Sequence, residues 1–254
     1  MHVVVIHRWQ NEIAELAPLL AAALEVTAFD ARQRLIGGSP VVVGSFGEAR
    51  PARALGRELQ KRGFYGFVLD AAAVRSGNTP FVVRRFELGG HSLRIEAVDG
   101  RREEIAFAAI DLLLPATSIS GHTETRTTTE RKFSMGKTLM AGGVPLTKKV
   151  KHQEEVAREE HEEVLHLRAA KRPPVLFYRS GMHYDGLGEA MKMSRELNFA
   201  YLISELRRPS PNAVYDERLR RRAGQAKLLG PALNPETNLD LAVEILARSL
   251  RRRG

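Results

Sequence analysis

The sequence contains no cysteine. This absence excludes disulfide bonds, thiolate zinc sites, iron–sulfur clusters and cysteine nucleophiles. A long apolar run is also missing, since the longest one, residues 16–24, falls well short of the about 20 residues that span a membrane. The amino-terminal residues begin with an apolar run and carry no basic leader, so we expect no signal peptide. These features predict a cytoplasmic protein.

Aromatic residues are scarce, at 6% of the chain with a single tryptophan, so stacking surfaces for nucleic-acid bases are not indicated. The formal net charge is +9, from 39 lysines and arginines against 30 acidic residues. This charge is spread along the chain apart from a terminal arginine cluster at 248–253. Nucleic acid is therefore disfavoured as a partner, whereas an anionic membrane surface stays open.

The first segment alternates short β-branched runs with amphipathic helical patterns. Thr27 is a typical helix cap before residues 28–36, and Gly37, Gly38 and Pro40 end that helix. We expect strands at 2–6 and 64–69, a strand or an extended connection at 41–43, and helices at 13–24, 28–36 and 51–62. Residues 1–74 therefore predict a β-α-α-β-α-β sandwich that folds on its own.

Within this segment, residues 27–35, the Pro40-Val41-Val42 step and the helix at 52–62 ending at Gly63 resemble the C-terminal domain of the ribosomal stalk protein. The Clp protease adaptor uses the same fold. The resemblance implies a docking module without catalytic residues. Of the stalk's basic helix face, Arg32 and Arg34 have counterparts, while residues 7–11 lack the acidic loop with which the adaptor recognises degrons.

The middle segment follows a linker at 75–80 and is rich in strand patterns. Asp99-Gly100 separates two alternating runs, which is a strong hairpin signal. We expect strands at 81–88, 93–97, 105–109, 110–119, 164–168 and 175–178, and a capping helix at 187–207. This arrangement resembles a pleckstrin-homology-like barrel. In that family a basic loop between the first two strands meets ligand phosphates. The corresponding loop here, residues 89–91, has no lysine or arginine, so the resemblance does not extend to inositol-phosphate binding.

Two further helices are expected at the C-terminal end. One covers residues 215–229, and the other opens at Asn234-Pro235, a cap followed by a proline in the first turn. The predicted fold class is therefore α+β. An N-terminal sandwich (1–74) precedes an antiparallel barrel with a capping helix (80–208) and a helical extension (212–254). The sequence leaves open whether the last helices pack on the barrel or on the N-terminal module.

Residues 120–163 form an insertion whose two arms are polar and whose tip is apolar and basic. The threonine-rich arms favour two paired strands that project from the barrel as a ribbon. A disordered surface insertion is the alternative. The residues expected to bind a partner lie at the tip: Phe133, Met135, Lys137, Leu139, Met140, Lys148, Lys149 and Lys151.

Two motif-like stretches do not support a catalytic site. Gly136-Lys137-Thr138 lacks the preceding glycine of a phosphate-binding loop, because Arg131 stands at that position. His161 and His166 are five residues apart, which places them on different faces of either a helix or a strand. We read them as two solvated histidines and expect no metal, cofactor or catalytic residue.

These observations favour a non-enzymatic adaptor whose partner is another protein. A peripheral protein that binds anionic surfaces through residues 132–151 is the second hypothesis. An enzyme whose site residues are dispersed along the chain is the third. Self-association through the tip is compatible with the first two.

Replacing residues 133–150 with a short Gly-Ser link should leave the melting temperature nearly unchanged, because an exposed tip adds little to the core. The same change should remove partner binding or self-association, because exposed apolar patches are usually covered by a partner. Thermal unfolding and analytical ultracentrifugation measure the two effects. Unfolding of the variant would show that the tip is part of the core, and interactions that persist would show that it is a passive loop.

Overall fold

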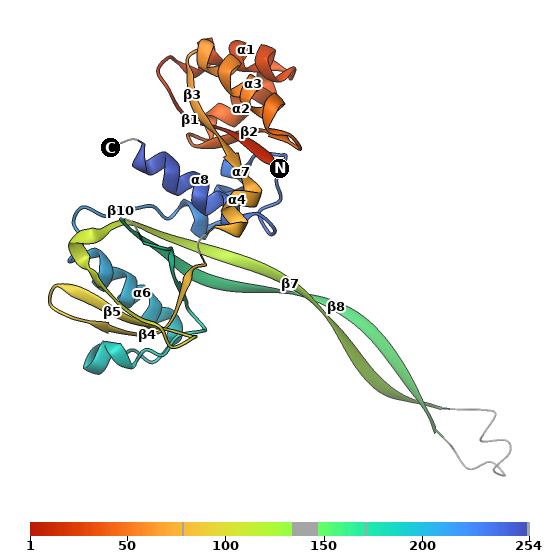
Figure 1. Cartoon of the computed structure of the whole chain (residues 1–254). Helices are drawn as coiled ribbons and strands as arrows, with labels where there is room; N and C mark the ends of the chain where they lie inside the picture. Colours follow the sequence, from red (N-terminus) through yellow and green to blue (C-terminus); the bar gives the residue numbers. More distant parts are fainter. Residues whose placement is uncertain (78, 134–146, 171, 253–254) are drawn as a thin grey trace. The chain divides into compact units, whose positions relative to one another are not determined.

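The computed structural model describes residues 1–77, 79–133, 147–170 and 172–252, and it describes the backbone alone for 119–133 and 147–160. The chain forms two compact units. One comprises Met1–Ser118 and Glu162–Gly254, and the other comprises Ile119–His161. The fold is mixed α and β with two sheets, as predicted (Figure 1).

The N-terminal module has the predicted element order. Its strands are β1 (His2–Trp9), β2 (Val41–Phe46) and β3 (Phe64–Asp70), and its helices are α1 (Ile13–Leu24), α2 (Ala28–Ile36) and α3 (Ala49–Lys61). The sheet order is β2-β1-β3, with both pairs antiparallel. Val4 and Ile6 face a core shared with the three helices, whereas Val3 and Val5 face the other side of the sheet. This alternation follows from the two-residue period of a strand.

The cap at Thr27 forms as expected. The Asp30 backbone N–H donates to Thr27 Oγ1 at 3.1 Å, and the Thr27 hydroxyl donates to Asp30 Oδ2 at 2.7 Å. These bonds satisfy a free donor of the first helical turn, so α2 starts at the predicted residue. A short helix that the sequence analysis did not predict, α4 (Ala71–Ser76), follows β3 and is capped by Asp70.

The second sheet has the order β10-β7-β8-β9-β4-β5-β6. Its strands are β4 (Phe81–Leu88), β5 (Ser92–Ala97), β6 (Arg102–Ala106), β7 (Ile110–Phe133), β8 (Thr147–Ala169), β9 (Val175–Tyr178) and β10 (Val214–Tyr215). Among the described residues the sheet does not close, and β10 and β6 are its end strands. The β4–β9 and β10–β7 pairs are parallel. The expectation of a closed, wholly antiparallel barrel is therefore corrected on these two points.

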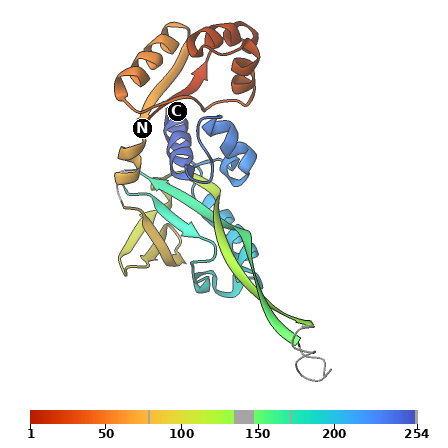
Figure 2. The same ribbon diagram turned by 90° about the vertical axis from the view of Figure 1, so that its right-hand side faces the viewer.

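Helix α8 (Leu239–Arg251) packs against both sheets. Its residues Leu241, Ile245 and Leu246 are fully buried in one cluster, which also contains Val3 and Val5 of β1 and strand residues such as Leu112, Leu114 and Val164. Figure 2 shows α8 between the two sheets. Helix α7 (Arg222–Leu229) contributes Leu228 and Leu229 to the same cluster. The C-terminal helices thus join the N-terminal module and the second sheet.

Helix α6 (Arg195–Arg207) covers the opposite face of the second sheet, with Phe199, Leu202 and Leu206 in that core. It starts eight residues later than predicted, since Ser194 caps it by accepting a hydrogen bond from the Leu197 N–H at 3.2 Å. Residues 185–190 instead form a 3-10 segment, η2, with Gly188 at a φ of 55°. The spacing of apolar residues in 191–206 favours core-facing positions for Met191 and Leu197, but both are exposed. Met191 lies before the start of α6, and Leu197 lies on the outer face of that helix.

Three other predicted boundaries also shift. Residues 215–229 contain a 3-10 turn, η3 (Arg218–Arg220), before α7, and α8 begins after Asn238 instead of at the Asn234-Pro235 step. Another 3-10 turn, η1 (Phe107–Ala109), separates β6 from β7. Strand β7 continues through Pro115, although proline usually interrupts a strand.

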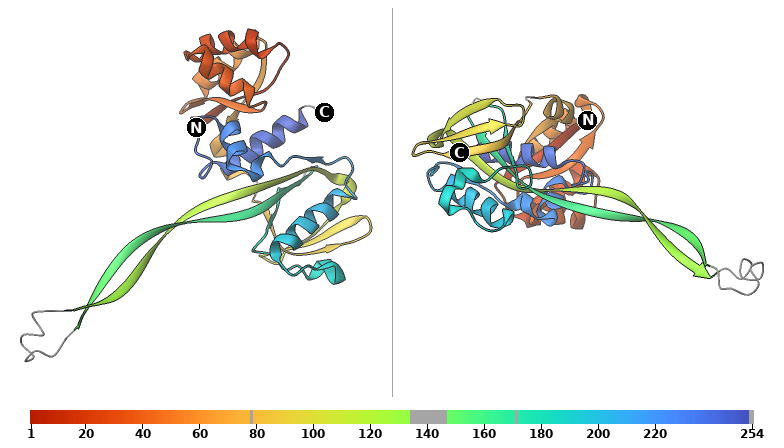
Figure 3. Two further views of the ribbon diagram at one scale, coloured as in Figure 1. Left: turned by 180° about the vertical axis from the view of Figure 1, so that it is seen from behind. Right: turned by 90° about the horizontal axis from the view of Figure 1, so that it is seen from below.

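The two arms of the insertion are strands, as predicted. β7 and β8 are neighbours in the sheet order, and Figure 3 shows them side by side, winding around each other.

Among the helices of the described residues, none has the length and apolar composition needed to cross a membrane.

Truncation of Leu246 to alanine should lower the free energy of unfolding by about 2–5 kcal/mol, because Leu246 is fully buried where the two sheets meet. Leu197, with 57% of its surface exposed, is the matched control, and its truncation should change stability by at most about 0.5 kcal/mol. Urea unfolding measures both. Equal effects would contradict the shared core described above.

Candidate functional site

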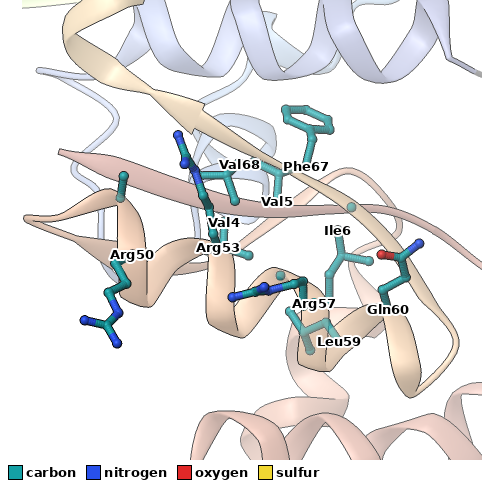
Figure 4. A pocket seen from close by; sticks show the side chains of 13 residues that line it. Val4, Val5, Ile6, Arg50, Arg53, Arg57, Leu59, Gln60, Phe67 and Val68 are labelled. Atoms are coloured by element: carbon teal, nitrogen blue, oxygen red, sulfur yellow. The ribbon is translucent and has the colours of Figure 1, made fainter.

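A cavity of about 640 Å³ lies between α3 and the strands β1 and β3 (Figure 4). Its apolar wall includes Val4 and Ile6 of β1, Leu59 of α3, and Phe67 and Val68 of β3. The two β3 residues are half-buried, so part of this apolar surface is accessible. We call this cavity and its lining the α3 groove.

Arginines of α3 line the groove. Arg50, Arg53 and Arg57 are spaced by three and four residues, which places them on one side of the helix. All three are exposed, and none forms an ion pair with a described residue. In contrast, Arg62 just after the helix pairs with Glu58 at 2.9 Å. Figure 4 shows Arg53 and Arg57 beside the strands, whereas Arg50 points away from them.

Two glycines shape the groove. Gly56 of α3 has no side chain opposite Val68, and a Cβ added there would lie 3.5 Å from Val68 Cγ2, in ordinary contact. A larger side chain at 56 would therefore enter the groove. Gly66 of β3 lies so close to β1 that an added Cβ would be 2.3 Å from the Val5 carbonyl oxygen. A side chain at 66 would push the strands apart, so glycine maintains their spacing there.

The β3 side of the groove is a sheet edge. β3 pairs only with β1 among the described strands, so its other edge has backbone groups without a strand partner. The guanidinium of Arg252 lies 4.9 Å from the ring centroid of Phe67, which places a further positive charge near the lining. The groove therefore combines apolar surface, a free strand edge and arginines.

No acidic residue belongs to the described lining, and its polar side chains are those of arginine and glutamine. Arginine stays protonated at every physiological pH, and its planar fork of donors matches a carboxylate in a two-bond arrangement. The groove can thus bind a ligand that is apolar and negatively charged. None of these side chains is a nucleophile or a general acid or base at neutral pH.

The partner-binding residues predicted from the sequence are outside this description. Four of them lie outside the described residues: Met135, Lys137, Leu139 and Met140. For the other four the structure describes only the strand backbone, in β7 for Phe133 and in β8 for Lys148, Lys149 and Lys151. Their role stays a prediction. The sequence analysis missed the α3 groove, although the arginine spacing was visible, because it considered only the inward residues of that helix.

His161 is exposed, but His166 is not the solvated histidine that the sequence analysis expected. His166 lies in β8, and its Nε2 is enclosed without a hydrogen-bond partner among the described residues. Burial, with a smaller effect of the Arg168 charge, lowers the pKa of His166 to about 3. In the described part of the chain, no three His, Asp or Glu side chains are placed to share a metal ion.

Stability should fall as the pH drops below about 6.5, the ordinary pKa of histidine, toward 3. The folded state keeps His166 neutral over this range while the unfolded state binds a proton, so acid favours unfolding. Within this pH range the His166→Gln variant should take up about one proton fewer on unfolding than the wild type, so its stability should depend less on pH. Urea unfolding from pH 7 to pH 4 measures this, with His161→Gln as the exposed control. A His166→Gln variant with the same pH dependence as the wild type would contradict the low pKa.

Comparisons with known proteins give no relative for this chain. No family model matches it, and neither the curated proteins nor the solved structures contain a match. The resemblance of residues 27–63 to the stalk and adaptor fold therefore stays a prediction from the sequence.

Proposed function

We propose that this protein is a non-enzymatic docking protein whose α3 groove binds an acidic, partly apolar segment of another protein. The observation that carries the proposal is the groove lining: apolar residues flanked by Arg53 and Arg57, with no carboxylate among the described lining residues to neutralise them. Charge complementarity therefore calls for a negatively charged partner.

A protein segment fits this lining better than a nucleic acid. Phe67 is the one aromatic residue of the described lining, so there is no row of rings on which bases could stack. The half-buried Phe67 and Val68 of β3 instead offer apolar surface suited to an aliphatic side chain, and the buried Val4 and Ile6 lie beneath it. Glutamate and aspartate carboxylates are natural acceptors for the two arginine forks.

The free edge of β3 favours an extended partner. An extended segment that pairs with a sheet edge gains main-chain hydrogen bonds, while its alternate side chains enter a groove. Side chains on one face of such a segment would reach the apolar wall, and acidic residues nearby would reach Arg53 and Arg57. We therefore propose that the partner segment alternates apolar and acidic residues.

Several finer assignments belong to the same proposal. The N-terminal module is similar to the stalk and adaptor fold, which serves as a docking module. The meander β4-β5-β6 with α6 on its face supports a relationship of the second sheet to pleckstrin-homology-like domains. Residence in the cytoplasm fits an adaptor of this kind. In the stalk fold the basic helix face corresponds to Arg32 on α2, so the groove on α3 is a different surface.

Binding to an anionic membrane surface is the second candidate. The sequence of residues 132–151 favours it, because lysines there flank apolar residues. This candidate uses a different part of the chain, so variants of the α3 groove should not affect it.

A fluorescein-labelled peptide that alternates glutamate with leucine should bind the full-length protein, and Arg53→Glu should weaken binding about tenfold or more, because a favourable charge pair becomes a repulsive one. Fluorescence anisotropy measures the affinity. Arg32→Glu is the matched control, since Arg32 is an exposed helix residue of the same module outside the groove lining. That variant should bind like the wild type.

Two further comparisons separate charge from shape. Gly56→Leu keeps every arginine but fills the groove, so it should also weaken binding. A peptide that alternates glutamate with serine keeps the charge and should bind less tightly than the leucine peptide. Added salt should weaken binding, as expected for exposed charges.

The proposal fails if the peptide does not bind, or if Arg32→Glu weakens binding as much as Arg53→Glu. It also fails if a single-stranded oligonucleotide competes better than the peptide. Co-sedimentation with phosphatidylserine vesicles that survives Arg53→Glu but is lost on replacement of residues 133–150 would support the membrane candidate instead.

A further inference from the structure

A second cavity, of about 770 Å³, lies within the larger compact unit and shares no lining residue with the α3 groove. Its walls come from three parts of the chain: α4 and the segment after it, β8 with the residues leading into β9, and one side of α8. The volume is in the range of pockets that hold small organic ligands. We call it the α8 cavity.

Four arginines line the α8 cavity: Arg75, Arg168, Arg172 and Arg248. Arg168 is the deepest, with 16% of its side chain exposed, whereas the other three are between 39% and 50% exposed. A dissolved ligand can therefore reach three guanidinium groups. Apolar residues, including Val74, Leu176 and Val243, complete the wall.

The carboxylates of the cavity balance these charges only in part. Asp240 pairs with Arg75 at 2.9 Å, while Glu244 accepts from both Arg168 at 2.9 Å and Arg248 at 2.7 Å. Arg172 pairs with Glu103, which lies outside the lining. Burial opposes the ionisation of Glu244, but Arg248 and Arg168 outweigh it and hold its pKa below the usual value. The single carboxylate of Glu244 thus pairs with both Arg168 and Arg248, so the cavity lining keeps a net positive charge.

The strand geometry explains why polar groups lie deep in this cavity. Val164, His166 and Arg168 alternate along β8, so their side chains share the face that packs toward α8. Two enclosed nitrogen atoms on this face, His166 Nε2 and Arg168 Nε, have no hydrogen-bond partner among the described residues. Arg168 Nε is a donor, and His166 Nε2 is a donor in one tautomer or when protonated.

We propose that the α8 cavity binds a small molecule that carries a diphosphate or polyphosphate group. Phosphate groups combine several negative charges with several acceptor oxygens, which matches clustered guanidinium donors. The apolar wall would contact the remainder of the molecule. This inference goes beyond the docking function, and it does not depend on it, because the two sites use different residues.

Isothermal titration of the full-length protein with inorganic pyrophosphate, at constant ionic strength, tests the proposal. The wild type should bind, and Arg172→Gln should bind roughly tenfold more weakly, because a charge-assisted contact is lost. Arg102→Gln is the matched control: Arg102 also pairs with one glutamate at 2.9 Å, lies outside the cavity lining and is 80% exposed. Melting temperatures confirm that each variant is folded.

A second readout reports on the site itself. A bound anion favours the protonated imidazole, so pyrophosphate should raise the pKa of His166 in an NMR titration of the histidine resonances. His166→Gln assigns that resonance. Weaker pyrophosphate binding by Arg172→Gln but not by Arg102→Gln, together with a raised pKa of His166, supports the proposal. Absence of pyrophosphate binding, equal losses in the two variants, or an unresponsive His166 would overturn it.

Discussion

Burial of α8 between the two sheets is the interaction on which the larger compact unit depends. Leu241, Ile245 and Leu246 are fully buried in a cluster that includes β1 of the first sheet and β7, β8 and β9 of the second. Burying a leucine or isoleucine side chain contributes about 1.5–3 kcal/mol. These residues therefore stabilise the contact between sheets that are distant in sequence. Both candidate sites depend on this contact. The α3 groove lies on the sheet against which α8 packs, and α8 itself forms one wall of the α8 cavity.

The two sites use arginine in different electrostatic settings. In the α3 groove, Arg53 and Arg57 are exposed and have no ion pair with a described residue, so their donors are available to a partner. In the α8 cavity each arginine already has a carboxylate partner, and the excess positive charge arises because Arg168 and Arg248 share Glu244. Arginine does not titrate in the physiological range. The groove should therefore respond to salt, whereas His166 gives the cavity a response to acid.

Local signals predicted much of the secondary structure. The cap at Thr27 placed α2 correctly, and the Asp99-Gly100 turn placed β5 and β6 in one hairpin. Where the predictions failed, a competing local interaction decided the outcome. Met191 has helical spacing to Leu202, yet α6 begins only after its cap at Ser194, so Met191 lies outside the helix and is exposed. Asn198 contributes to this arrangement, because its side chain bonds the backbone N–H and carbonyl of Lys192. The prediction of a closed barrel was wrong because strand pairing in the second sheet joins residues far apart in the chain. The residue pattern of a single strand does not show whether its partner runs parallel or antiparallel.

The sequence by itself determined the α+β composition, the order of elements in the N-terminal module and the absence of thiol chemistry, and it favoured strand arms for the insertion without excluding disorder. These properties depend on neighbouring residues, on strand and helix periods and on composition, all of which a sequence contains. Only the tertiary structure decided which face α8 covers, which arginines lack an acidic neighbour and which histidine is enclosed. Ion pairing and burial depend on residues far apart in the chain: Arg75 meets Asp240, and Arg168 meets Glu244. His161 and His166 look equivalent in the sequence, but the packing of α8 against β8 encloses the Nε2 of His166 alone.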